Sequence, residues 1–429
     1  MRFALTEYQN NCQYHLRLVD SQEARYVVNI VQNILDFNVG RDPERLAMKY
    51  AKMRTSPYVF LRGTCHLFYD RLQVDSLPAD APTAWICGDL HLENFGSYKG
   101  DNRLVCFDIN DFDESTLAPV SWDLVRLLAS VFAAAASLRI TPKQAALLCG
   151  EFMSAYGSAL ESGKASWIDR DSADGLVKTL LDALRNRSRV EHLDKYTKLA
   201  KKSRVIRCDG ERSLKTSSKK TAHATELVEA YAATLKDKKF FDVIDVAHRI
   251  AGAGSLGVER YMVLVKGKGS PDENYLLDVK QAFPSSLERH VAVSRRRWSS
   301  QAGRVVTLQN RMQATSTAFL SAVTAAKGKR SYVVRALQPS ADRVALDDPS
   351  VTFKQISDVV NQMGRIVAWA HLRGSGLEGS ATADTLVAFG ASRSIWQAQL
   401  LAAAQQCAAQ TVDDWTAYVT AYDAGTFAR

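Results

Sequence analysis

A glycine-rich stretch, GAGSLG at residues 252–257, limits the folds open to this chain because it stands between two runs of β-forming residues. Gly252, Gly254 and Gly257 have the spacing G-x-G-x-x-G, which in a dinucleotide-binding unit precedes a helix. Here the next run, VERYMVLV, is typical of a strand. The pattern therefore predicts a strand–loop–strand unit whose backbone can cover a phosphate group, and an ordinary hairpin is the alternative interpretation.

A lysine follows one predicted strand later. Lys280 ends the apolar run YLLDVK, 23 residues after Gly257. In kinase-type phosphate-binding units, the lysine on that strand contacts the phosphates beneath the loop. We therefore predict that Gly252, Gly254, Ser255, Gly257 and Lys280 bind a nucleotide, ATP.

A second polar motif, GDLHLENFG at residues 88–96, follows the apolar run TAWIC, where a strand is predicted to end. Asp89 and Asn94 are five positions apart, the spacing at which kinase-type sites place an acceptor-contacting aspartate and a magnesium-binding asparagine. We predict that Asp89 orients or deprotonates the acceptor and that Asn94 binds Mg²⁺. His91 and Glu93 are interpreted as supports of this loop, because the C-x-x-C that accompanies H-x-E in zinc deaminases is missing.

The third motif, FDINDFDE at residues 107–114, supplies more carboxylates. Asp111 stands where a second magnesium-binding carboxylate is required, and Asp113 is close enough to join it. Asp108 is a competing candidate, and a solvated acidic turn is the alternative for the whole cluster. The metal hypothesis is favoured because the motif lies between an apolar strand and an apolar helix.

The rest of the pattern predicts an α+β fold. Helices are predicted at residues 21–54 with Asp42 as an N-cap, from 122, at 141–163 with a capping box, at 301–323, and from 352 onward. Strands are predicted in PYVFLRG, TAWICGD and RLVCFDINDFDE, on both sides of the glycine loop, and in NYLLDVKQA and SYVVRAL.

The order of the motifs is unusual. In small-molecule kinases of the aminoglycoside and choline type, a helix ending in a pattern like L-x-x-L-H leads into a catalytic loop H-G-D-x-H-x-x-N. Here the similar helix, MGRIVAWAHLRGSG, comes at residues 363–376, near the end of the chain. This resemblance implies a bilobal protein-kinase-like fold whose chain order is circularly permuted. The implied parts are an N-terminal segment 1–84, a catalytic-lobe core 85–235, a β-rich nucleotide-binding lobe 236–345, and returning helices 346–429.

Five motifs in this order, GDLHLENFG, FDINDFDE, WDLVRLLAS, GAGSLGVERY and WAHLRG, together resemble the bacterial domain-of-unknown-function family 2252 over most of the chain. The local motifs are also similar to aminoglycoside phosphotransferases, because DFDESTLAPVSWD places Asp123 twelve residues after Asp111. The resemblance implies a phosphotransferase that uses ATP and Mg²⁺ and acts on the hydroxyl or amine of a small molecule.

One departure from active kinases keeps other functions open. Such kinases hold the lysine with a glutamate of the next helix, but the predicted helix 301–323 contains no acidic residue, with Glu288 the nearest substitute and Gln309 a weaker one. A nucleotide-binding pseudokinase and a nucleotidyl transferase are therefore the alternatives to a phosphotransferase.

The net charge of +9 is concentrated in residues 185–220, which carry 13 Lys and Arg against 4 Asp and Glu. This basic segment is interpreted as a solvated insertion, with a nucleic-acid-binding scaffold as a third hypothesis that is not favoured, because Tyr196 is its only aromatic residue. The N-terminus lacks an apolar signal region and the longest apolar run is too short for a membrane span. We predict a cytoplasmic protein without membrane contact.

Overall fold

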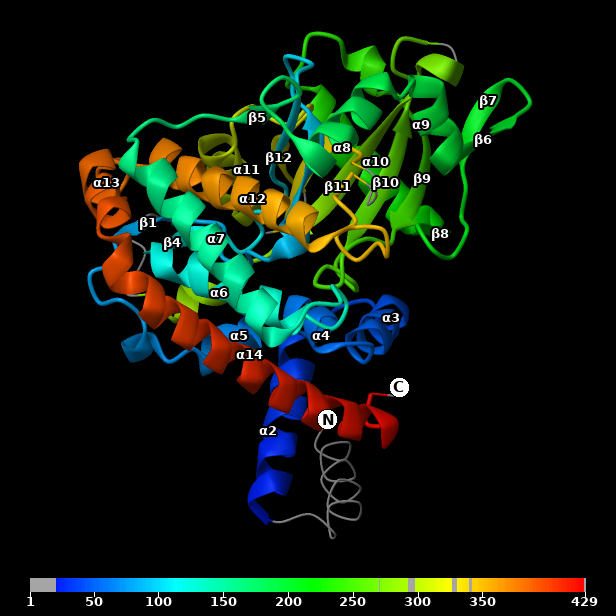
Figure 1. Cartoon of the computed structure of the whole chain (residues 1–429). Helices are drawn as coiled ribbons and strands as arrows, with labels where there is room; N and C mark the ends of the chain where they lie inside the picture. The colour runs from blue at the N-terminus through cyan, green and yellow to red at the C-terminus, as the bar shows by residue number, and fades with distance from the viewer. Residues whose placement is uncertain (1–20, 270, 292–297, 326–329, 339–341, 428–429) are drawn as a thin grey trace.

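The structure is a computed structural model, and it describes residues 21–269, 271–291, 298–325, 330–338 and 342–427. It is a mixed α+β protein with 50% helix and 16% strand, which confirms the predicted α+β class. Figure 1 shows a large sheet packed beside a layer of long helices. None of the helices in the described ranges has the length and apolar character needed to cross a membrane.

The described part of the chain begins and ends with groups of helices, and its strands lie between them. The helices are α2 Ser21–Phe37, α3 Pro43–Met53, α4 Pro57–Gly63, α5 Cys65–Arg71, α6 Val120–Ala133, α7 Pro142–Glu161, α8 Gly175–Asn186, α9 Arg189–Tyr196, α10 Ser218–Ala232, α11 Gln301–Met312, α12 Phe353–Arg373, α13 Ala383–Ala391 and α14 Arg393–Asp423. The strands are β1 Thr83–Ile86, β2 Phe95–Lys99, β3 Val105–Ile109, β4 Thr116–Pro119, β5 Ile168–Asp169, β6 Thr197–Ala200, β7 Ser203–Ile206, β8 Ser213–Leu214, β9 Val243–Arg249, β10 Arg260–Val265, β11 Tyr275–Ala282, β12 Ser321–Thr324 and β13 Ser331–Ala336.

The largest sheet has six strands in the order β12-β13-β11-β10-β9-β8, and its neighbouring strands are antiparallel. Because side chains alternate between the two faces of a strand, Val263 and Val279 pack on α10 while the residues next to them point the other way. The register places Arg260 opposite Lys280 and Asp278 opposite Arg335. A row of charged side chains therefore lies on the face opposite α10.

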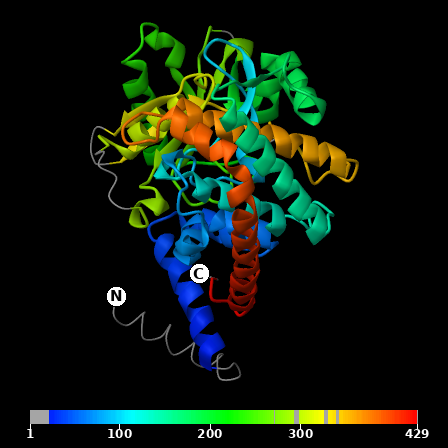
Figure 2. The ribbon, with the colours of Figure 1, turned by 60° about the vertical axis from the view of Figure 1, so that its left-hand side comes forward.

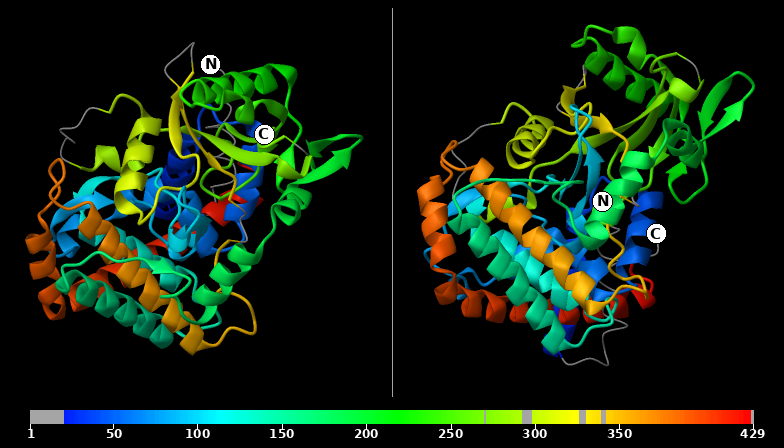
Figure 3. Two further views of the ribbon diagram at one scale, coloured as in Figure 1. Left: turned by 90° about the horizontal axis from the view of Figure 1, so that it is seen from above. Right: turned by 45° about the horizontal axis from the view of Figure 1, so that its top comes forward.

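The helical layer forms the main hydrophobic core. In α12, Ile356, Val359, Val360, Met363 and Ile366 are buried at the three- and four-residue intervals that the sequence predicts. This face packs along α7, and Figure 3 shows the two helices side by side. The capping box predicted for α7 is present, because Thr141 and Gln144 satisfy each other's backbone amides.

Segments far apart in the sequence meet at the other end of the molecule. The long helix α14 lies against α2, as Figure 2 shows. A small core that includes Ile30, Tyr50 and Tyr418 joins α2 and α3 to α14, and the Tyr418 hydroxyl donates to the Tyr50 carbonyl at 2.8 Å. The first described elements are therefore fixed in place by one of the last.

Two predictions of secondary structure were wrong. PYVFLRG was predicted to be a strand but forms α4, because Ser56 accepts a hydrogen bond from the Val59 amide as an N-cap and Pro57 occupies the first turn. The helix predicted over 301–323 ends at Met312, and its last residues form the edge strand β12. Pairing with β13 outweighs local helix propensity there.

The basic segment 185–220 is only partly solvated, so its interpretation as a solvated insertion is corrected. It supplies α9, the β6–β7 hairpin and β8, and it buries Leu193, Tyr196 and Ile206 against the large sheet. Arg204 is also buried and pairs with Asp194 and Asp272 at 2.6 and 2.7 Å.

Candidate active site

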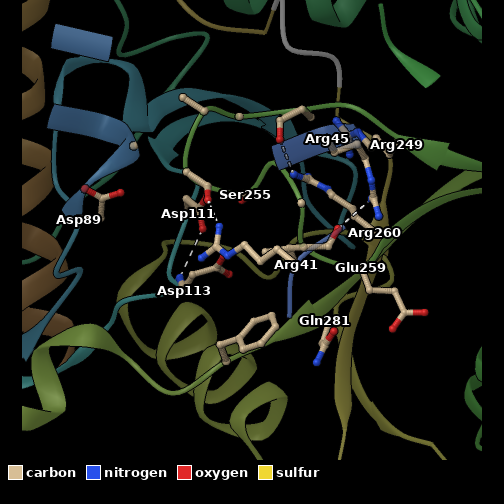
Figure 4. Close-up of a pocket in the computed structure, with 18 of the residues that line it drawn as sticks. Arg41, Arg45, Asp89, Asp111, Asp113, Arg249, Ser255, Glu259, Arg260 and Gln281 are labelled. Atoms are coloured by element: carbon tan, nitrogen blue, oxygen red, sulfur yellow. Dashed lines mark hydrogen bonds between the residues drawn. The ribbon is translucent and has the colours of Figure 1, made fainter. Parts of the chain in front are cut away.

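A cleft of about 870 Å³ opens between the charged face of the large sheet and the loops that follow β1 and β3. Figure 4 shows that its two sides differ in charge. Asp89, Asp111 and Asp113 lie toward one side, and Arg249 and Arg260 lie toward the other. The loop at residues 252–257 lines the same cleft, so three separate sequence motifs meet there.

Lys280 connects the sheet to the acidic side. It projects from β11 with its side chain only 6% exposed, and its ammonium Nζ forms an ion pair with Asp113 and lies 3.6 Å from Asp111 Oδ2. Burial favours protonation of both carboxyls, but Lys280, Arg335 and Arg260 together lower the pKa of Asp111. Burial and the neighbouring Asp111 carboxylate raise the pKa of Asp113. The two carboxylates thus share one cation and repel each other, an arrangement that a divalent ion would relieve.

Asn94 holds the two acidic loops together. Its side chain is 97% buried, and its amide nitrogen Nδ2 lies 3.1 Å from both the Asp89 and the Asp111 carbonyl oxygens. Its amide oxygen Oδ1 is buried, with no hydrogen-bond partner in the described chain. A buried acceptor without a partner costs free energy, so this oxygen fits a magnesium ligand set together with Asp111 and Asp113. No group of three or more His, Cys, Asp and Glu in the described ranges forms a metal cluster by itself.

Asp89 is held on one side only. The buried guanidinium of Arg126 donates to its Oδ1 from Nη2 at 2.7 Å and from Nε at 3.2 Å. Its other oxygen has no hydrogen-bond partner within the described residues, and the side chain is 25% exposed toward the cleft. Arg126 therefore fixes the carboxylate while leaving Oδ2 free to accept a proton.

The backbone before Asp89 is fixed by a buried carboxylate. Asp123, at the start of α6, accepts hydrogen bonds from the amides of Cys87 and Gly88, both at 2.8 Å. His371 of α12 lies 3.4 Å from the same carboxylate. Charge-assisted hydrogen bonds of this kind are stronger than neutral ones, so the turn that presents Asp89 is rigidly attached to the helical layer.

The glycine-rich loop is held by its carbonyl groups. Arg41 Nη1 donates to the carbonyl oxygens of Gly254 and Leu256 at 2.8 and 3.3 Å, and Arg45 Nη1 donates to that of Val258 at 2.9 Å. Among the described residues, the amides of positions 252–257 donate to no protein acceptor. The loop is thus anchored through its acceptors while its donors remain available for an anion.

Gly257 explains why this loop requires glycine. Its φ is +85°, and a Cβ atom there would lie 2.9 Å from the Cβ of Arg41. Gly252 also has a positive φ, +72°. β9 and β10 pair antiparallel as in a hairpin, but the ten residues that separate them make this loop longer than a tight hairpin turn.

Other candidates lie outside the cleft or act as supports. Asp108 is buried, accepts from the Ala314 amide at 3.0 Å and faces Arg373, so it does not join Asp111. His91 Nδ1 accepts from the Glu93 amide at 3.1 Å, and burial lowers the pKa of His91. Glu93 forms ion pairs with Arg62 and Arg343. Both residues therefore support the loop, as the sequence interpretation has it.

Neither substitute for the missing acidic residue of α11 reaches Lys280. Glu288 lies 3.9 Å from Arg304, and Gln309 donates to Gln313 and Thr317. Asp111 and Asp113 are the described partners of this lysine instead.

Sequence reasoning missed four arginines that line the cleft, Arg41, Arg45, Arg249 and Arg260. Arg41 and Arg45 belong to an N-terminal helical region without a recognisable motif. The sequence pattern could have indicated Arg260 and Asp278, because each is a charged residue in a strand that is otherwise largely apolar. That signal indicates a buried charge cluster but does not say which residues pair.

The fold and the cleft define a mixed α+β protein in which several carboxylates and a glycine-rich loop line one cavity, and a buried lysine pairs with two of those carboxylates. The chain belongs to the family described as uncharacterized protein conserved in bacteria (DUF2252), which it matches over residues 41–421. No curated protein and no solved structure matches it.

Proposed function

We propose that this protein is an ATP- and magnesium-dependent phosphotransferase with a kinase-like, circularly permuted arrangement, acting on the hydroxyl or amine of a small molecule. The observation that carries the proposal is the ion pair of Lys280 with Asp113, beside Asp111, because both carboxylates line a cleft that the loop at 252–257 also lines. Asp89 lines the same cleft, although 191 positions separate it from Lys280 in the sequence.

The order of elements supports the permuted arrangement. The glycine-rich loop joins β9 to β10, Lys280 follows on β11, and α11, β12 and β13 come next. This order resembles the strand–loop–strand, lysine strand and helix of a kinase nucleotide lobe, which supports the proposal. It lies after the Asp89 motif in sequence, and α12 then returns to pack beside α7.

Asn94, Asp111 and Asp113 would hold the magnesium ion. When bound, it neutralises the charge that develops on the transferring phosphoryl group. Lys280 contacts phosphate oxygens in exchange for part of its present ion pairing. The free amides of the glycine-rich loop donate to the same phosphates.

Asp89 acts on the acceptor. Its unpaired Oδ2 takes the proton of the acceptor hydroxyl or amine as a new bond forms to the γ-phosphorus, and the bond from that phosphorus to the oxygen of ADP breaks. Arg126 holds Oδ1 throughout. The phosphorylated acceptor, ADP and one proton are the products.

A thermal-shift experiment tests the proposal. Magnesium-ATP should raise the melting temperature of the wild-type protein, because a ligand that binds only the folded state stabilises it. Lys280→Ala and Asp111→Ala should each abolish the shift, and Asp182→Ala, at an exposed ion pair with Arg170, should retain it. A wild-type protein whose melting temperature does not respond to magnesium-ATP would contradict the proposed function.

A pseudokinase that binds nucleotide without transferring phosphate is the second candidate. It is favoured by the absence of an acidic residue in α11, so that Lys280 relies on the metal-site carboxylates alone. Turnover, measured as ADP release, separates the two candidates. Nucleotidyl transfer with the same residues would instead release pyrophosphate.

Nucleic-acid binding through residues 185–220 has weaker support. Arg204, one of the basic residues of this segment, is buried in ion pairs and is unavailable to a phosphate backbone. The exposed Lys198, Lys201 and Lys202 remain on the β6–β7 hairpin.

A further inference from the structure

Three arginines surround one buried aspartate at the basic side of the cleft. Arg260 binds Asp278 through two hydrogen bonds, from Nε to Oδ1 at 2.8 Å and from Nη2 to Oδ2 at 2.6 Å. Arg249 Nη1 lies 2.7 Å from Asp278 Oδ2, and Arg335 Nε lies 3.5 Å from it. All three arginines line the cavity, whereas Asp278 is 1% exposed.

This arginine cluster, defined as Arg249, Arg260 and Arg335, carries two more positive charges than Asp278 compensates. Its side chains are between 7% and 13% exposed, so water screens them poorly. Burial, together with the repulsion from Arg260 and Arg335, lowers the pKa of Arg249 to about 10 despite the attraction of Asp278. An excess of buried positive charge is costly unless an anion compensates it.

The carbonyl partners of the cluster orient it without neutralising it. Arg249 Nη2 donates to the Gln338 carbonyl oxygen at 2.5 Å, and Arg335 Nη1 donates to that of Asn110 at 3.0 Å. Guanidinium groups held in fixed positions are suited to phosphate oxygens, which can accept two parallel hydrogen bonds.

The cluster lies toward the other side of the same cleft as the acidic residues, but near enough for Arg335 and Arg260 to join Lys280 in lowering the pKa of Asp111. Figure 4 shows Arg249 and Arg260 near Arg45, with Arg41 between this group and Asp111 and Asp113. On the sheet face toward this end of the cleft, Arg260 lines the cavity and pairs with the buried Asp278 behind it.

We propose that the arginine cluster binds a phosphate group, so that the cleft accepts phosphate chemistry at both ends. This deepens the proposed function and rests on it in one respect, that a magnesium–phosphate complex occupies the acidic end. The phosphate at the arginine end belongs either to the far end of a polyphosphate donor or to a separate phosphorylated acceptor. Both sources present the same group to the arginines.

Calorimetric titration with pyrophosphate in the presence of a metal chelator tests the cluster directly. Wild-type protein should bind pyrophosphate without magnesium, and Arg249→Gln and Arg335→Gln should each weaken the affinity by about tenfold or more, the usual scale of a charge-assisted hydrogen bond. Arg170→Gln, at an exposed ion pair outside the cleft, is the matched control and should bind as the wild type does.

The thermal stability of the unliganded variants separates binding from structure. In Arg249→Gln, two arginines still compensate Asp278, so the melting temperature without ligand should not fall. Arg249→Lys keeps the charge but loses the paired guanidinium donors, so its affinity should lie between those of Arg249→Gln and the wild type, which gives a second readout if the glutamine variant folds poorly. Absence of pyrophosphate binding to the wild type would overturn the proposal. So would an affinity in Arg249→Gln and Arg335→Gln equal to that of the wild type.

Repeating the titration with saturating magnesium-ATP distinguishes the two sources. If ATP blocks pyrophosphate, the arginine cluster holds a phosphate of the donor; if pyrophosphate still binds, the cluster holds a separate molecule. The two proposals also fail differently. Pyrophosphate binding without any change of melting temperature on addition of magnesium-ATP would contradict the phosphotransferase but not the phosphate site. A melting-temperature shift with magnesium-ATP but no pyrophosphate binding would contradict the phosphate site alone.

Discussion

Asp89 and Asp111 are both cleft carboxylates, but their partners differ. Asp89 is bound through one oxygen by Arg126, a residue of the buried helix α6. Asp111 lies beside Lys280 and Asp113, and its backbone carbonyl accepts from Asn94. Under the proposed function, the first arrangement would position a proton acceptor, and the second would concentrate negative charge for a cation. Loss of each residue should therefore have a different effect.

Asp89→Asn should leave magnesium-ATP binding nearly unchanged and lower the rate of ADP release by about 10²-fold or more, the usual scale for a positioned acid–base group. The asparagine keeps an oxygen for Arg126, so the fold should survive. Calorimetry gives the binding, and slow ATP hydrolysis gives the rate before an acceptor is known. Asp111→Asn, the matched variant, should lose both binding and turnover. Hydrolysis by Asp89→Asn at the wild-type rate would show that Asp89 is not the base.

At the level of elements, the glycine-rich loop and the start of α3 form one unit. Arg41 and Arg45 hold the loop carbonyls, and the Asp42 amide donates to the Gly257 carbonyl at 2.9 Å. Asp42 also caps α3. The helix start that the sequence predicts therefore has a second role that only contacts across more than 200 residues define.

Gly257→Ala tests this close approach. A residue with a side chain at positive φ costs about 1–3 kcal/mol, and here the new methyl group would also press against Arg41. Gly210→Ala is the matched control, because Gly210 has a φ of +80° but open space around its Cβ position. Urea unfolding should show a larger loss of stability for Gly257→Ala than for Gly210→Ala. Equal losses would mean that the close approach of Arg41 to Gly257 adds nothing to the free-energy cost of the substitution.

At the level of the whole molecule, several histidines are buried in the neutral form. Burial lowers the pKa of His66, His91, His192 and His248 in the folded state, to about 4 for the last two. Below pH 6.5 the unfolded chain takes up protons that the folded chain does not. The stability that these histidines contribute is therefore fully present above about pH 6.5 and is lost as the pH falls toward 4.

His248→Gln should flatten this pH dependence. His248 stacks on Tyr261 at 5.4 Å, and its share of the loss between pH 7 and pH 5 should be about 1–2 kcal/mol. Urea unfolding of the wild type and the variant across this pH range gives the slope of the unfolding free energy against pH for each protein. Thr216→Ala removes the contact at His248 Nε2 but keeps the titrating group, so it should retain the wild-type slope. An unchanged slope in His248→Gln would contradict the claim that His248 causes part of this pH dependence.

Much of the site could be read from the sequence because its parts are local. The glycine spacing at 252–257, the five-residue step from Asp89 to Asn94, and Lys280 at the end of a strand each reflect the geometry of one turn or one strand. The burial period of α12 and the capping box of α7 are local in the same sense. Short-range sterics and hydrogen bonds decide such features, so a single sequence contains them.

The tertiary structure decided which distant charges meet. Local sequence is also ambiguous for short apolar runs: PYVFLRG has the composition of a strand, and its N-cap and packing made it a helix. Arg41 reaches the glycine-rich loop from 213 positions away, and Arg249, Arg260 and Arg335 converge on Asp278 through the register of four strands. The sequence determined the kinds of groups that the cleft contains. Strand register and helix packing determined that carboxylates face arginines across it, because pairing over such separations depends on the closed fold and not on any local pattern.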